Sequence, residues 1–160
     1  MKTIGIFLGV EPSAGGMFQY AQAMLDALKV HKMEGGRVVV AYVAPLWKPV
    51  LERYPFHHVQ VSGGTLGLRM ADLAMAVRLP GPLARALAGR LNPIARQLRR
   101  LACDLWIFPA QDALSYQVDL PVVASVHDLM HRYEPQFPEV SKGGRFAIRE
   151  HRFRKLVSWS

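Results

Sequence analysis

Short runs of apolar residues alternate with stretches of helical spacing along the whole chain. The runs are bounded by glycine, proline or polar residues, which is typical of strands that a parallel sheet buries on both faces. They lie at residues 3–9, 37–43, 56–61, 105–108 and 122–126, and a sixth strand is predicted to begin at Leu156–Trp159. Between the first two runs, apolar residues recur with the period of a helix, for example at Phe18, Ala21 and Leu25.

The region 65–102 is predicted to be helical in consecutive pieces. Proline and glycine at 79–82 break it, and Asn92 before Pro93 is typical of a helix cap followed by proline at the first helical position. One face of the first piece carries Leu66, Met70, Leu73 and Val77. Since parallel strands need crossover connections, the alternation predicts a three-layer, Rossmann-like α/β domain with a parallel sheet of about six strands.

Composition favours one globular domain without an address to a membrane or to secretion. The length of 160 residues fits a single domain, with 51% hydrophobic and 20% charged residues. Cys103 is the only cysteine, which excludes an intrachain disulfide and favours a reducing compartment. The apolar run at 4–10 is interrupted by glycine and is too short for a secretory or spanning segment. We therefore expect a cytoplasmic chain, whose net charge of +8 favours an anionic partner.

The loop after the first strand carries Gly15 and Gly16 and leads directly into a helix. In a parallel sheet, ligands bind at the carboxyl ends of the strands, and a helix start attracts phosphate through its free N–H groups and its dipole. The dinucleotide and P-loop glycine patterns are absent from this loop. Phosphate approach and a plain strand-to-helix turn both remain open interpretations.

His127 and Asp128 follow the fifth strand, at the same predicted edge of the sheet. The imidazole could exchange hydrogen bonds near neutral pH, and the carboxylate that follows could orient it. A loop histidine bonded to the backbone is the simpler alternative. His131 lies four residues after His127, as in a helical metal pair, but the zincin glutamate is missing and Pro135 favours a loop. We therefore expect no metal site.

Basic residues are concentrated in two helical stretches. One spans 85–100, and the other runs from about Ser141 to Lys155. Such helices suit an anionic membrane surface at the inner face, although solvated helix faces are the commonest alternative. Aromatic residues are not interleaved with the charges, so no nucleic-acid partner is expected. Arg145 and Arg149 are predicted to lie near the His127 loop and to line the cleft.

Several motifs in a fixed order resemble family 4 glycosyltransferases. The glycine-bearing first turn ends at Tyr20. The later stretches are Asp104–Pro109, Leu120–Leu129, Phe137-Pro138 and Leu156–Ser160, the last resembling a strand and the serine that follows it. The resemblance covers the whole chain as the amino-terminal, acceptor-side half of a two-domain GT-B enzyme. It implies retaining transfer of a sugar from a nucleotide-sugar donor to a glycan or lipid-linked acceptor, without a metal.

The resemblance also implies roles for particular residues. His127 would lie against the transferred sugar, Asp128 would support its loop, and Gly15 and Gly16 would approach the donor phosphates. Tyr20, Arg145 and Arg149 would belong to the acceptor and phosphate side.

The donor-binding half that the family possesses is missing from this chain. The family's two glutamates, which are separated by seven intervening residues, have no counterpart, because no two glutamates here lie eight positions apart. We expect the 160 residues to fold, to self-associate through the uncovered cleft and not to transfer sugar unaided. A stand-alone, non-catalytic α/β domain that binds an anionic partner is the alternative from a different functional class.

Overall fold

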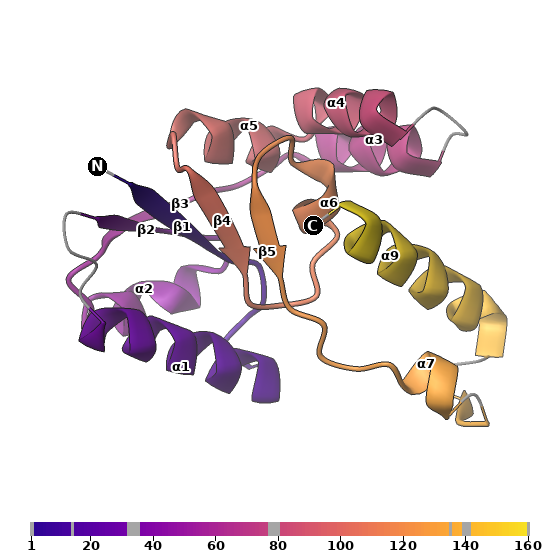
Figure 1. Cartoon of the computed structure of the whole chain (residues 1–160), viewed down its shortest axis with the longest axis horizontal. Coiled ribbons are helices and arrows are strands. Elements are labelled where there is room, and N and C mark those ends of the chain that lie inside the picture. The colour runs from indigo at the N-terminus through magenta and orange to yellow at the C-terminus, as the bar shows by residue number, and fades with distance from the viewer. Residues whose placement is uncertain are drawn as a thin grey trace.

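A parallel sheet forms the centre of the computed structural model, which describes residues 2–13, 15–31, 36–76, 81–134, 136–138 and 142–159. Helices and strands alternate along the chain (Figure 1), with η marking short 3₁₀ helices. Their bounds in chain order are β1 Thr3–Leu8, α1 Gly16–Val30, β2 Arg37–Tyr42, η1 Pro45–Trp47, α2 Lys48–Leu51, β3 His57–Gln60, α3 Thr65–Ala76, α4 Gly81–Leu91, α5 Pro93–Arg100, β4 Leu105–Phe108, α6 Leu114–Gln117, β5 Val122–Ala124, α7 Met130–Tyr133, η2 Lys142–Gly144 and α9 Arg145–Trp159.

The strands of the described residues form one five-stranded sheet in the order β3-β2-β1-β4-β5. Every pairing is parallel: Gly5 of β1, for example, lies opposite Val39 of β2 and Trp106 of β4. The Rossmann-like α/β class is therefore confirmed. Because all strands run the same way, their carboxyl ends meet at one edge, and the loops that follow them lie along that edge.

Both faces of the sheet are buried, because successive side chains of a strand point to opposite faces. Ile6 and Leu8 pack with α1 and α2, in a cluster that also contains the buried Trp47. Phe7 points the other way and packs with Trp106 and with the apolar side of α5. Figure 1 shows α1 and α2 on one side of the sheet and α3, α4 and α5 on the other. The near-continuous apolar strands of the sequence reflect this double burial.

The predicted apolar face of α3 points to solvent. Leu66 is 73% exposed, and Met70 and Leu73 are exposed as well, while Val77 lies outside the described residues. The side that packs inward carries Ala71 and Met75, which join a cluster with α4, α6 and α9. The pattern of apolar residues identified the helix correctly, but the inward face uses smaller residues than the outward one.

The prediction of a sixth strand at Leu156–Trp159 is wrong. These residues form the last turn of α9, which begins at Arg145, and the predicted start at Ser141 lies outside the described residues. Leu156 is buried while Val157 and Ser158 are exposed, and Leu156 follows Arg149 and Arg152 at helical spacing along one side of α9. The resemblance of Leu156–Trp159 to a family strand is therefore not supported by the structure, and Ser160 lies outside the described residues.

Candidate functional site

Two connections leave the sheet in opposite directions at the adjoining ends of β1 and β4. The chain passes from β1 to β2 on one side, and from β4 to β5 on the other. In open parallel sheets, ligands bind in the crevice outside such a switch point. The loop after β1, described at residues 9–13 and 15, and the loop at residues 109–113 border that crevice. Sequence reasoning selected the loops after β1 and β5 and missed the loop after β4, the strand that lies between β1 and β5.

The glycine-bearing loop opens directly into α1. Gly15 is the residue before the helix and has a φ of 59°, a backbone conformation that favours glycine. A Cβ built on Gly15 or Gly16 would meet nothing within 4 Å, so the backbone here is open to an approaching group. At the other end of the loop, Trp47 Nε1 donates to the Val10 carbonyl at 2.6 Å and fixes the chain where it leaves β1.

His127 lies against α1, which brings the two predicted loops together. Its ring meets the Tyr20 ring edge to face, with centroids 5.1 Å apart and an interplanar angle of 87°. The Ser125 hydroxyl lies 3.4 Å from the Tyr20 hydroxyl. The turn at Gly16 and the loop after β5 therefore share one rim of the sheet, as the sequence predicted.

The His127 ring is hydrogen bonded to the backbone of the loop after β4. Its Nε2 and the Pro109 carbonyl oxygen form the bond. Because a carbonyl oxygen can only accept, Nε2 donates the proton of this bond, and Nδ1 is the ring nitrogen that the bond leaves available. The ring is exposed, so Nδ1 is the atom with which His127 can meet a ligand.

Asp128 holds its own loop and does not orient His127. Its Oδ1 accepts from the Met130 N–H at 3.0 Å and lies 3.6 Å from Arg149 Nη1. The Asp128 and Arg149 side chains are 47% and 40% exposed, so their pairing contributes at most about 1 kcal/mol. Of the two interpretations that the sequence left open, the structure favours the histidine bonded to the backbone: the His127 ring bonds to Pro109, and the contacts of Asp128 are with Met130 and Arg149.

A cluster of charges fastens α7 to α9 next to this loop. Glu150 accepts from Arg132 Nε at 2.8 Å and Nη2 at 2.7 Å, and from Arg154 Nε at 2.7 Å. The Arg132 guanidinium also lies over the Phe153 ring, 4.3 Å from its centroid. The hydrogen bonds to the Glu150 carboxylate raise the pKa of Arg132 above its ordinary value. The contacts fix the Asp128 loop relative to the Arg149 side of α9.

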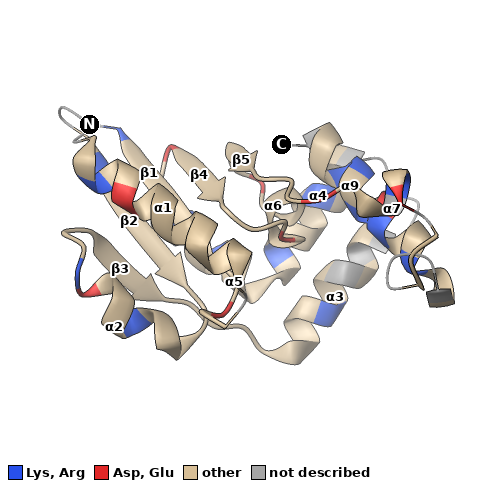
Figure 2. Ribbon diagram, turned by 90° about the horizontal axis from the view of Figure 1, so that it is seen from below, with Lys and Arg blue, Asp and Glu red and all other residues tan. Residues whose placement is uncertain are grey.

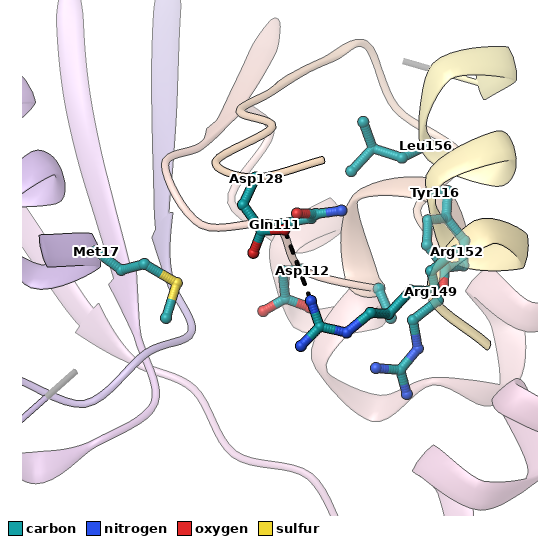
Figure 3. A pocket seen from close by; sticks show the side chains of 9 residues that line it. Met17, Gln111, Asp112, Tyr116, Asp128, Arg149, Arg152 and Leu156 are labelled. Atoms are coloured by element: carbon teal, nitrogen blue, oxygen red, sulfur yellow. Dashed lines mark ion pairs between the residues drawn. The ribbon is translucent and has the colours of Figure 1, made fainter. Parts of the chain in front are cut away.

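A cavity of about 260 Å³ opens between the start of α1, the loop after β4 and α9. Figure 3 shows Arg149 pointing toward Asp128, with Met17 across the opening. Asp112 lines it, and its Oδ1 accepts from the N–H of Leu114, the first residue of α6, at 2.8 Å. The lining residues are Met17, Gln111, Asp112, Ala113, Tyr116, Asp128, Arg149, Arg152 and Leu156.

The predicted site residues fall into two neighbouring groups. Asp128 and Arg149 line the cavity, and Met17 links it to the preceding Gly15 and Gly16. Tyr20 and His127 lie beside it in contact with each other, and Arg145 begins α9 without lining it. Sequence reasoning missed Gln111, Asp112 and Arg152. For Asp112, the available signal was a polar residue in the loop that follows the buried strand at 105–108.

Metal and membrane features can be judged within the described ranges. No group of three or more His, Cys, Asp or Glu side chains there is placed to hold a metal ion. His127 precedes α7, so it and His131 do not share a helix. Among the same residues, no helix is both long and apolar enough to cross a bilayer.

No protein-family model matches the sequence, and no curated protein matches it. The fold and the site geometry therefore carry the functional argument.

Proposed function

We propose that this chain is the amino-terminal, acceptor-side domain of a GT-B glycosyltransferase that resembles family 4. The enzyme would transfer a sugar, with retention, from a nucleotide-sugar donor to a glycan or lipid-linked acceptor. The contact between Tyr20 and His127 carries the proposal, because it joins a helix start suited to phosphate and a histidine at one edge of the sheet. Binding of the nucleotide is assigned to a second domain.

Each residue takes a role in the proposal that its position permits. Gly15 and Gly16 let the donor phosphates approach the N–H groups at the start of α1. His127, held by Pro109 through Nε2, presents Nδ1 to the transferred sugar. Asp128 keeps the loop in place, and Arg149 lines the acceptor side. Arg145, which begins α9 and does not line the cavity, adds positive potential to this side.

A stand-alone domain that binds an anionic partner is the second candidate, favoured by one observation. Arg152 lines the cavity without an ion pair among the described residues, in a chain of net charge +8. Sugar transfer by the natural protein that contains this chain distinguishes the candidates, because a binding domain has no turnover.

We also propose that the exposed side of α3 and α4 meets an anionic membrane surface. Leu66 and Leu73 on α3 and Leu87 on α4 are exposed aliphatic residues. Between residues 61 and 103 the chain has seven arginines and a single acidic residue, Asp72. Figure 2 shows basic residues on α3 and α4. Apolar side chains flanked by arginine suit the boundary between headgroups and acyl chains.

The test of the catalytic proposal is His127→Ala in the natural protein, assayed for transfer from a panel of nucleotide-sugars. We expect transfer to fall by about 100-fold, the scale of a lost positioning contact, with an unchanged circular dichroism spectrum. His57→Ala is the matched control, because His57 is also exposed but lies on β3, at the far edge of the sheet. Equal activity of both variants would remove His127 from the site.

A further inference from the structure

A second cavity, of about 400 Å³, continues the first one along α9. It lies between α3, α6 and α9 and shares Ala113, Tyr116 and Arg152 with the first cavity. The two cavities therefore adjoin along α9, and together they are here called the α9 groove. The lining residues of its second part are Met75, Ala113, Tyr116, Gln117, Ala147, Ile148, His151 and Arg152.

The first part of the α9 groove offers two guanidinium groups to an anion. Arg152 has no ion pair among the described residues, and Arg149 has only the long, exposed contact of 3.6 Å with Asp128. The nearby Glu150 carboxylate already accepts from Arg132 and Arg154. In Figure 3, both guanidinium groups project from α9 toward the hollow. Guanidinium groups bind phosphate oxygens in a fork geometry, so a phosphate or diphosphate fits this part.

The second part of the groove is mainly apolar and suits a hydrocarbon chain. Ile148 lines it and is 53% exposed, and Met75 and Ala147 lie beside it. A half-exposed isoleucine is stabilised when a hydrocarbon removes it from water. Ile148 and Arg152 are one helical turn apart on α9, about 6 Å along its axis. A single extended molecule can therefore reach both the arginines and the apolar part.

We propose that the α9 groove binds an amphiphile, with a phosphate or diphosphate head at Arg149 and Arg152 and its hydrocarbon chain against Ile148 and Met75. The inference rests on the proposed function and names its acceptor class as a lipid-linked phosphate. Free phosphate would leave the apolar part uncovered, and a neutral lipid would add no anionic partner for Arg149 or Arg152.

The first experiment measures binding of three probes to the chain by calorimetry. Farnesyl diphosphate, used below its micelle-forming concentration, carries both head and chain, inorganic diphosphate carries the head only, and farnesol carries the chain only. We expect farnesyl diphosphate to bind at least about 10-fold more tightly than either part, because only it fills both parts of the groove. Equal affinity for inorganic and farnesyl diphosphate would overturn the proposal.

Paired variants assign the binding to the groove. Arg152→Gln should weaken farnesyl diphosphate binding by about 10-fold, whereas Arg154→Gln removes the same charge from the same helix, outside the groove, and should change it less than about 2-fold. Ile148→Gln should weaken farnesyl diphosphate but not inorganic diphosphate. Val157→Gln is its control, because Val157 is similarly exposed on α9 and lines neither cavity. All four side chains are exposed, so the variants should fold.

The outcomes separate this proposal from the catalytic one. If Arg152→Gln and Arg154→Gln weakened farnesyl diphosphate binding equally, the assignment of the binding to the groove would be overturned. The binding would then depend on the overall positive charge of α9. Groove-dependent binding without sugar transfer by the natural protein would support the amphiphile site and remove the enzyme. Transfer to a soluble glycan without binding of farnesyl diphosphate would support the enzyme and remove the amphiphile site.

Discussion

Gly5, at the centre of β1, is predicted to be intolerant of even one added methyl group. A Cβ at this position would lie 2.5 Å from Cδ2 and Cε3 of the Trp106 ring and 2.7 Å from Cζ3. Ordinary carbon contacts are about 3.5 Å, so the ring or the strand would have to move by roughly 1 Å. Trp106 is fully buried and packs with Phe7 and Leu98, which leaves the ring no free direction.

The magnitude for Gly5→Ala follows from two opposing effects. Overpacking a filled core costs about 1–3 kcal/mol. Replacing glycine by alanine within a strand recovers roughly 0.5–1 kcal/mol of backbone entropy. The free energy of unfolding should therefore fall by about 1–2 kcal/mol. In urea, with an m value of about 2 kcal/mol/M, the midpoint moves down by roughly 0.5–1 M.

The control is Gly64→Ala, where a Cβ would meet nothing within 4 Å. This variant should stay within about 0.5 kcal/mol of the parent, the usual range for surface changes. In a Trp106→Leu background, which lacks the indole ring, Gly5→Ala should cost less than in the parent. If Gly5→Ala matched the parent, or if its cost were identical in both backgrounds, the close approach of β1 to Trp106 would not limit this position.

Two further predictions concern pH and membranes. Burial raises the pKa of the Cys103 thiol from its ordinary 9.0 to about 11. The unfolded chain therefore loses this proton at a lower pH than the folded chain does, and the free energy of unfolding should fall as the pH rises from 9.0 to about 11. In Cys103→Ala the urea midpoint should fall less over this range, and an identical pH profile would contradict the assignment. For α3 and α4, the chain should sediment with anionic phosphatidylglycerol vesicles and not with neutral ones, and the double variant Leu66→Gln, Leu73→Gln should reduce this binding. Equal weak binding to both vesicle types would remove the membrane proposal.

The sheet was predictable because its strands are buried on both faces and so appear as continuous apolar runs. The prediction failed at Leu156–Trp159, where a short apolar run is equally compatible with a helix end. Leu156 follows Arg152 by four residues and Arg149 by seven, and this helical spacing was the signal for the helix. On α3, the spacing of Leu66, Met70 and Leu73 identified one face, but spacing cannot tell whether that face points to the core or to solvent.

The candidate site was predictable in part, for a reason that lies in the sheet order. His127 lies in the loop after β5, and Gly16 lies where the loop after β1 enters α1, so the rule for parallel sheets identified them. Arg152 was hidden among similar arginines of α9, because only the position of the Glu150 carboxylate separates it from Arg154. Asp112 was missed because strand order is not chain order, and nothing in the sequence places β4 between β1 and β5.

That placement makes the loop after β4 the common support of both proposed binding regions. Its Pro109 carbonyl holds the His127 ring, and its Asp112 lines the first cavity and accepts from the Leu114 N–H at the start of α6. Its Ala113 lines both parts of the α9 groove. A shift of this loop would therefore move the histidine and the groove together. Coupling of this kind suits an enzyme that must align two substrates, since a change in position of about 1 Å is enough to slow a reaction by two orders of magnitude.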